Sequence, residues 1–375
     1  KCSAKGPVRT SACLQKSDAG DMIPISRNTP SYPPDSAGSA SGAVRSLRPA
    51  RRSRRGAGLL ALAAACVSLL TPLKAQSVAV GLHYGRDDSI TQYNNFGSWL
   101  GRKVLYRVTF ADYTSWDGIS APWFLSTSRT WINSDPKRVE VLTLAMMPKG
   151  DTAGFGPIIR GERDYVFTSA ARRINNLGIT SRVIVRLGWE GNGDWYPWAY
   201  ASDPAGYRSA FRRIVQVMRK EASTLRFEWN ISYRASRRGG PAHWTEGYPG
   251  DDVVDVISMD VYDEWNTWAS LRDGEAGLKE LRAFAIAHNK PEAYSEWSCS
   301  TKKTAGGGDN PTFIANMAAW MAERPGGVLY QAYWNMYSGG PNGAIYGSVV
   351  NVPNAAAAFK SHFSFPSAPN SLVVE

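Results

Sequence analysis

The sequence predicts an α/β fold, a (β/α)8 TIM barrel in a single domain, and two observations support this prediction. After residue 76, short apolar runs alternate with amphipathic stretches, and no long linker separates them. Runs that are nearly continuous in Val, Ile, Leu and Tyr are typical of parallel strands buried on both faces. Eight such runs interleaved with helices favour a barrel. A doubly wound sheet is the alternative, but no Gly-x-Gly-x-x-Gly pattern follows the first run.

The expected strands occupy residues 78–84, 104–110, 139–147, 181–187, 225–231, 254–262, 291–297 and 327–334. The clearer helices show start and stop signals. The helix over residues 165–177 ends before Gly178, and the helix over 203–222 begins with Asp203 and Pro204. Further helices are expected over 274–289 and 310–324, and less regular helical patterns cover 86–100, 120–133 and 353–363.

Residues 1–75 differ in composition from the rest of the chain. They contain twelve of the 43 Lys and Arg residues but three of the 32 Asp and Glu residues. The remaining chain, with 31 basic and 29 acidic residues, is nearly neutral. The basic character of the whole chain therefore does not indicate a nucleic-acid partner, and none is expected.

The same N-terminal segment resembles a leader. Residues 1–44 are rich in Ser, Pro, Gly and Ala and are predicted to be disordered. Several arginines then precede an apolar run, Gly56 to Leu70, with Ala75 at a suitable cleavage point, which is the order of a secretory signal peptide. The run is short for a membrane span. We expect residues 76–375 to be the mature domain, secreted or periplasmic, with lipidation at Cys66 as the alternative.

Beyond residue 75 the sequence offers one cysteine, Cys299, and no Cys/His cluster with ligand spacing. No disulfide can form within that part, so its stability depends on the apolar core. We expect no metal ion and no cofactor. A monomer is expected.

The segment Trp189 to Trp198 carries the strongest functional signal. The buried run 181–187 leads to Glu190, and Trp195, Tyr196 and Trp198 follow within a few residues. A carboxylate can transfer protons, and aromatic faces pack against the apolar faces of sugar rings. This combination favours a carbohydrate-cleaving site at the end of the fourth strand.

Alternation along the strands predicts which side chains share a face. Arg186 and Glu190 share one on the fourth strand, and Tyr294 and Glu296 share one on the seventh. The same reasoning pairs residues 260 and 262 on the sixth strand and residues 330, 332 and 334 on the eighth. Glu190 and Glu296 should converge on one rim, and two convergent carboxylates suffice for glycoside hydrolysis. Their proximity should raise one pKa relative to the other and separate the two roles.

Three ordered motifs resemble glycoside hydrolase family 26, whose best-known members are β-mannanases. The family pattern Arg-x-Gly-His-Glu-x-Asn-Gly followed by Trp-Tyr-Pro-Trp is matched between Arg186 and Trp198, apart from its histidine. Further matches lie at 248–262 and at 291–296. The resemblance covers residues 79–363 and implies a retaining endo-β-glycanase on a (β/α)8 barrel.

The resemblance also implies roles for individual residues. Glu190 would be the general acid/base and Glu296 the nucleophile, with Tyr262 hydrogen-bonded to Glu296. Trp334 would form the floor beneath the sugar at the cleavage point. The remaining substrate-binding candidates come from the resemblance or from strand ends, and they are Trp189, Asn192, Trp195, Trp198, Arg186, His83, Asp112 and Trp229.

One departure from the family concerns the backbone sugar of the substrate. The family's histidine before the acid/base is Trp189 here, which removes a polar contact beside the scissile bond. The expected partner is a β-linked polysaccharide, with β-1,4-mannan first and a β-1,4- or β-1,3/1,4-glucan or xylan as alternatives. A non-catalytic carbohydrate-binding barrel is the other class, but such a protein would lose one carboxylate, and both glutamates are present.

Overall fold

A computed structural model describes residues 78–85, 89–233, 243–324 and 326–364. The predicted disordered extension, signal peptide, cleavage point at Ala75 and lipidation site at Cys66 lie outside these residues. Within the described part of the chain, no helix is both long and apolar enough to cross a membrane.

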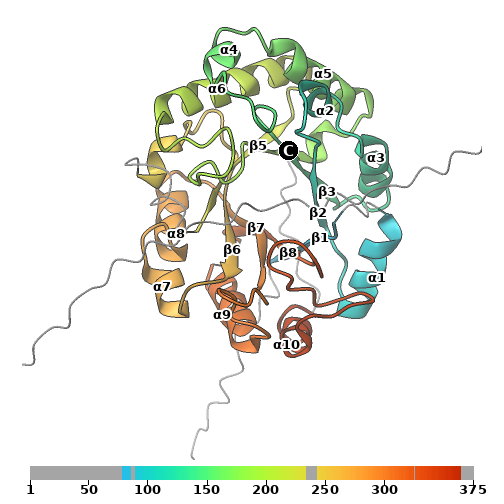
Figure 1. Cartoon of the computed structure of the whole chain (residues 1–375). Coiled ribbons are helices and arrows are strands. Elements are labelled where there is room, and N and C mark those ends of the chain that lie inside the picture. Colours follow the sequence, from blue (N-terminus) through green and yellow to red (C-terminus); the bar gives the residue numbers. More distant parts are fainter. Residues whose placement is uncertain (1–77, 86–88, 234–242, 325, 365–375) are drawn as a thin grey trace, which may run out of the picture. The chain divides into compact units, whose positions relative to one another are not determined.

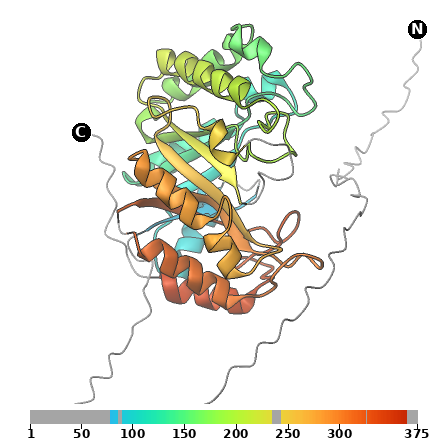
Figure 2. The same cartoon turned by 90° about the vertical axis from the view of Figure 1, so that its left-hand side faces the viewer.

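Eight parallel strands form a closed barrel in the order of the sequence, and helices surround them in both views (Figures 1 and 2). Each of the eight predicted runs overlaps one strand, so the expected (β/α)8 barrel is confirmed. The strands are β1 Ala79–His83, β2 Tyr106–Phe110, β3 Val139–Leu144, β4 Val183–Leu187, β5 Arg226–Ser232, β6 Val256–Asp263, β7 Glu292–Cys299 and β8 Val328–Trp334.

The seven predicted helices are present, and the capping signals explain where two of them begin. Asp203 accepts a hydrogen bond from the Gly206 N–H, and Asn310 accepts one from the Phe313 N–H. The helices are α1 Ile90–Leu100, α3 Leu125–Asn133, α5 Asp164–Asn176, α6 Pro204–Glu221, α8 Leu278–Ala287, α9 Pro311–Ala322 and α10 Pro353–Phe363.

Sequence periodicity missed three short helices, α2 Trp116–Ser120, α4 Gly156–Ile159 and α7 Trp268–Asp273. Each is too short to show a repeating apolar face. α7 begins at Trp268, with Thr267 as its N-cap.

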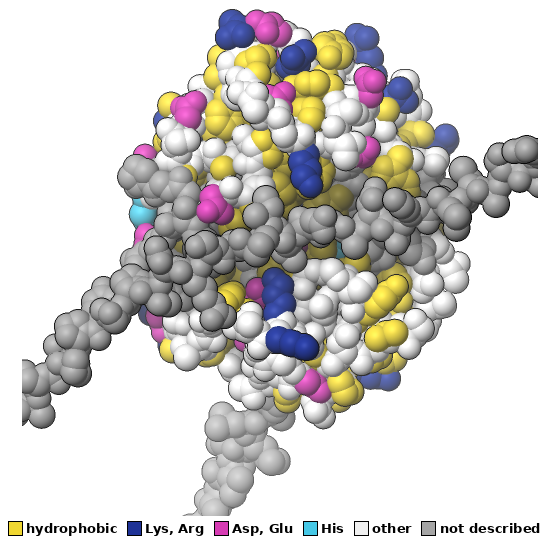
Figure 3. Space-filling model, viewed as in Figure 1, with side chains coloured by type: hydrophobic (Ala, Val, Ile, Leu, Met, Phe, Trp, Pro, Cys, Tyr) yellow, Lys and Arg dark blue, Asp and Glu magenta, His cyan; other side chains and the backbone are white. Residues whose placement is uncertain are grey.

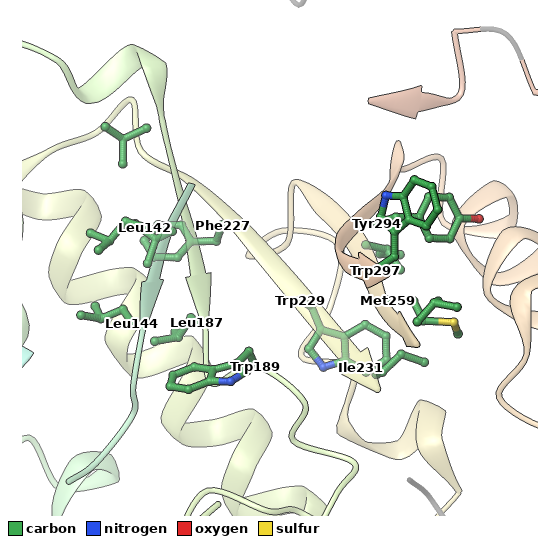
Figure 4. Close-up of a cluster of buried hydrophobic side chains, with 14 of the residues drawn as sticks. Leu142, Leu144, Leu187, Trp189, Phe227, Trp229, Ile231, Met259, Tyr294 and Trp297 are labelled. Atoms are coloured by element: carbon green, nitrogen blue, oxygen red, sulfur yellow. The ribbon is translucent and has the colours of Figure 1, made fainter. Parts of the chain in front are cut away.

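Two apolar layers build the core. The larger lies between strands and helices, and Figure 4 shows Leu187, Phe227, Trp229 and Ile231 among its side chains. The smaller fills the barrel and contains Ile184, among other small and β-branched side chains. Strand alternation therefore sends one set of residues to the helices and the other into the barrel.

A β-bulge in β7 overturns the predicted pairing of Tyr294 with Glu296. The register between β7 and β8 shifts between Tyr294 and Trp297. Tyr294 points to the helices, where its hydroxyl accepts from the Trp320 indole at 2.6 Å. Ser295 and Glu296 both contact residues inside the barrel. One additional residue in the strand reverses the alternation and turns Glu296 inward.

On the face seen in Figure 3, basic and acidic side chains are interspersed around the barrel. This arrangement agrees with the near-neutral composition of the chain after residue 75. The surface charge thus gives no reason to expect a polyanionic ligand on the described part of this face.

Candidate active site

Glu190 lies just beyond β4 on a tightly constrained turn. Gly188 and Glu190 both adopt positive φ, 55° and 50°. A Cβ at Gly188 would approach the Met146 sulfur to 2.5 Å, so this turn requires glycine there. A left-handed glutamate costs about 1–3 kcal/mol and persists where the surroundings fix it. Here Asn230 on β5 fixes it, because its Oδ1 accepts the Glu190 N–H at 3.0 Å.

Glu296 is held by two charge-assisted hydrogen bonds. The Arg186 guanidinium donates from Nη1 to Oε1 at 2.5 Å, and the Tyr262 hydroxyl donates to Oε2 at 2.5 Å. Burial and the neighbouring negative charges, chiefly that of Glu296, raise the pKa of Tyr262 well above its usual range. Tyr262 therefore remains a donor, and both oxygens of Glu296 are stabilised as a carboxylate.

Arg186 organises the buried floor beneath the two glutamates. Its Nη2 donates to Asn230 Oδ1 at 2.9 Å and to Asp260, and its Nε lies 3.7 Å from Glu228 Oε1. Burial alone would lower the pKa of Arg186, but the charges of Asp260, Glu296 and Glu228 together raise it. The guanidinium thus stays charged and orients the nucleophile candidate.

The electrostatic environment of Glu190 raises the pKa of its carboxyl group. Burial raises its pKa, and the charge of Glu296 raises it further, to about 7. The charge of Arg186 and the hydrogen bond from the Trp195 indole, 2.8 Å from Glu190 Oε2, act in the opposite direction. Burial also raises the pKa of Asp260 well above its usual range, so Glu190 and Asp260 are the two carboxyl groups of this site that hold a proton most readily.

An ionised carboxylate beside a protonated one can attack a carbon centre while a leaving oxygen receives a proton. Cleavage of a glycosidic bond requires such a pair of carboxyl groups. Among the described residues, no cluster of His, Cys, Asp and Glu has the arrangement of a metal site.

Aromatic side chains border the two carboxylates. Trp334 at the end of β8 is half-buried and stacks on His83, with ring centroids 4.0 Å apart. Burial lowers the pKa of His83, and its Nδ1 lies 3.0 Å from the Val108 carbonyl oxygen, so the ring is neutral and donates there. Trp195, which is 44% exposed, reaches Glu190 from the other side. The structure therefore brings together Glu190, Glu296, Tyr262, Trp334, Trp195 and His83.

Four of the predicted substrate contacts have buried side chains with structural contacts. Trp229 points outward and packs against Trp244, since it alternates with the inward-facing Asn230. Trp198 is fully buried, and its indole donates to the Trp189 carbonyl. Asn192 binds the backbone of Ser232, which ties the β4 turn to β5. The fourth is Arg186, which lies under the site and contacts protein carboxylates.

Trp189 and Asp112 also differ from the expectation. Trp189 is 2% exposed and stands edge-to-face against Phe110, Tyr113 and Tyr196, so it shapes the pocket wall from behind. Asp112 is exposed beyond β2, where its carboxylate accepts from the Thr114 N–H and hydroxyl. Trp189 is therefore covered by other aromatic rings, whereas Asp112 is exposed and held by the turn after β2.

Two inward-facing residues of β5, Glu228 and Asn230, complete the floor. Asn230 links Arg186, Glu190 and Asp260, while Glu228 accepts hydrogen bonds from Ser258, Ser295 and Tyr330. Strand alternation on β5 places Asn230 on the inward face that it shares with Glu228.

Comparison with known proteins agrees with this geometry. The family model of glycosyl hydrolase family 26 matches residues 158–279, which include β4 with Glu190 and β6 with Tyr262. Over this segment the chain is similar to glycosyl hydrolase family 26. The chain is 26% identical over 240 residues to a mannan endo-1,4-beta-mannosidase of Bifidobacterium adolescentis. It is 34% identical over 118 residues to endoglucanase H of Acetivibrio thermocellus.

The matches to these two relatives are partial. They cover 60% and 30% of this chain but 23% and 13% of the relatives' own lengths. Among solved structures, an endo-beta-1,4-mannanase of Cellulomonas fimi is similar with a TM-score of 0.57 and 16% identity, over 82% of this chain and 75% of that one. The mannanase man26 of Bacillus subtilis gives 0.55 and 15%, over 80% and 89%. At these identities the structural likeness concerns the fold.

Proposed function

We propose that this protein hydrolyses the backbone of a β-linked polysaccharide as a retaining endo-glycanase. The observation that carries the proposal is the pair Glu190 and Glu296, which face one site under different electrostatic control. Two carboxylates with opposite protonation states are what a double displacement requires.

In the proposed reaction, the Glu296 carboxylate attacks the anomeric carbon as the bond to the leaving oxygen breaks. Glu190 gives its proton to that oxygen, so the leaving sugar departs as a neutral alcohol. Glu190, now ionised, then removes a proton from water, and the resulting hydroxide displaces Glu296 and restores both groups. Arg186 and Tyr262 are positioned to receive Glu296 again as a carboxylate.

The proposed substrate is β-1,4-mannan, because the Bifidobacterium relative and several structural neighbours are described as mannanases. A β-glucan is the second candidate, favoured by the match to endoglucanase H and by Trp189 where the family carries histidine. Initial rates on mannan, mixed-linkage glucan, cellulose, laminarin and xylan test both. Turnover of mannan supports the first, turnover confined to a glucan supports the second, and no turnover of any of them overturns the activity.

The proposal extends to export. The arginines, the apolar run Gly56 to Leu70 and Ala75 support secretion as a monomer after cleavage near Ala75, with lipidation at Cys66 as the other route. Mass spectrometry of the N-terminus from an exported sample distinguishes them. A terminus at residue 76 supports cleavage after Ala75, a lipid-modified Cys66 supports anchoring, and a chain that retains residues 1–75 overturns both.

The basic limb of the pH profile should report the protonation of Glu190. Because the acid form is needed and its pKa is raised to about 7, kcat/KM should fall as pH rises through that value. The Trp195 indole stabilises the ionised form, so Trp195→Phe should move the limb to higher pH. The profile is measured with an activated oligosaccharide, and Trp123→Phe, at an exposed tryptophan elsewhere, serves as control. A limb that moves to lower pH would contradict the assignment.

Removal of the Trp334 indole should weaken transition-state binding. Trp334→Ala should cost about 1–3 kcal/mol in kcat/KM, since the ring stacked on His83 offers the platform for the reacting sugar. Steady-state kinetics on oligosaccharides check this, with Trp123→Ala as a control for losing an exposed indole. An unchanged kcat/KM in folded protein would place Trp334 outside the site.

A further inference from the structure

A second pocket lies outside the barrel wall, between the β6–α7 connection and the start of α9. Its volume is about 300 Å³, at the lower end of ligand sites, which span roughly 300–1,000 Å³. Six of the side chains that line it are Asp263, Asn266, Asn310, Asn316, Trp268 and Phe313. None of them belongs to the machinery around Glu190 and Glu296.

The lining combines planar polar groups with aromatic rings. Three side-chain amides and one carboxylate can each bind adjacent hydroxyl groups, and Trp268 and Phe313 supply apolar faces. Among the described lining residues, Asp263 alone carries a charge, and a carboxylate repels anions. A calcium ion takes about six to eight oxygen ligands, and a single carboxylate cannot supply that many. The pocket chemistry therefore fits a neutral, polyhydroxylated ligand with an apolar face.

The pocket walls are fixed before any ligand arrives. Asn310 caps α9 by accepting the Phe313 N–H at 3.1 Å, and its Nδ2 donates to Asp263 Oδ2 at 2.9 Å. Thr267 caps α7 by accepting the Ser270 N–H at 3.2 Å. Pre-organised polar groups lose little entropy when a ligand binds.

The residue before the lining residue Asn266 is an exposed tryptophan. Trp265, next to the lining residue Asn266, is 63% exposed and has a φ of 62°. A bulky residue in the left-handed region costs about 1–3 kcal/mol, and such strain clusters at ligand sites. The backbone N–H of Trp265 donates to the Ala305 carbonyl at 2.7 Å, which fixes the loop in this conformation.

We propose that this pocket binds a neutral hexopyranosyl unit of the polysaccharide, at a site separate from the one that contains Glu190 and Glu296. The inference rests on the proposed function, because it assigns the pocket to the same class of substrate. Tyr262 faces the active site and the next residue, Asp263, faces the pocket, so only the strand β6 separates the two. A polymer held at both sites gains affinity that a short substrate does not.

Two variants test the pocket without altering the active site. Asn316→Trp fills the cavity from α9, and Trp268→Ala removes its apolar wall. Asn175→Trp, at an exposed position on α5, and Trp123→Ala are the matched controls. Affinity electrophoresis in gels containing soluble galactomannan or mixed-linkage β-glucan gives the dissociation constant, and an aryl oligosaccharide gives kcat/KM at the active site.

We expect both pocket variants to raise the dissociation constant for the retarding polymer about tenfold, which corresponds to about 1.4 kcal/mol. Their kcat/KM on the aryl substrate should match that of the controls. If both variants are retarded as strongly as the unaltered protein, the pocket inference is overturned while the proposed function stands. If the unaltered protein neither binds nor cleaves either polymer, the proposed function fails and the inference with it.

Discussion

Glu296→Ala should abolish turnover of the polysaccharide while leaving the barrel folded. Loss of the attacking carboxylate removes the covalent route, and kcat should fall by about 10⁴-fold or more. The fold should survive because Arg186 keeps Asn230 and Asp260 as partners. Initial rates on the best polysaccharide and the thermal midpoint are measured together.

Rescue of activity by small anions gives a second test of the role of Glu296. Added azide or formate can occupy the space left by the Glu296 carboxylate and restore glycosyl transfer, with azide yielding an α-glycosyl product from a β-linked substrate. The matched control is Glu323→Ala, at a half-exposed glutamate after α9, which should retain full activity. Near-normal polysaccharide turnover by Glu296→Ala would rule out Glu296 as nucleophile.

Glu190→Ala should have an effect that depends on the leaving group. Cleavage of the polysaccharide should slow by about 10²–10⁴-fold, because a sugar alcohol cannot depart without a proton. An activated aryl leaving group needs no proton, so formation of the glycosyl-enzyme should be largely preserved and its hydrolysis should become rate-limiting. Pre-steady-state measurement should therefore show a burst of aryl alcohol.

An added nucleophile such as azide also distinguishes the roles of Glu190 and Glu296. Azide needs no general base, so it should accelerate turnover of the Glu190→Ala glycosyl-enzyme and yield a β-glycosyl azide. Equal losses on polysaccharide and activated substrate, with no burst, would contradict the assignment of Glu190 as acid/base.

Alternation and strand order were enough to predict much of this site. β4 places Arg186 below Glu190, and β6 brings Tyr262 to the barrel interior, because the extra residue at the irregularity between β6 and β7 lies on β7 and leaves the alternation of β6 intact. Trp334 likewise follows from the alternation of β8. The barrel itself follows from eight apolar runs separated by helical stretches.

Other features depend on tertiary contacts that no local pattern encodes. The bulge in β7 turns Ser295 and Glu296 inward together, so Glu296 reaches the site although the predicted pairing with Tyr294 is wrong. The indole rings of Trp198 and Trp229 are of the kind that stacks on sugars, yet each packs into the core. A tryptophan serves either purpose, and only the surrounding packing decides between them.

The arginine at the centre of the site shows the same limit. Arg186 contacts residues 44, 74 and 110 positions away in the sequence, Asn230, Asp260 and Glu296. Sequence alone could place each on an inward face but could not show that one guanidinium joins them. That link places the guanidinium against Glu296, whereas Glu190, whose pKa is raised to about 7, lies outside its hydrogen bonds.

The stereochemistry of the first-formed product tests the central claim most directly. Proton NMR recorded within the first minutes of hydrolysis, before mutarotation, identifies the anomer released from a β-linked oligosaccharide. A double displacement through Glu296 predicts the β-anomer first, with the α-anomer growing in only as the sugar equilibrates. Initial release of the α-anomer would show single displacement by water and would contradict the role assigned to Glu296.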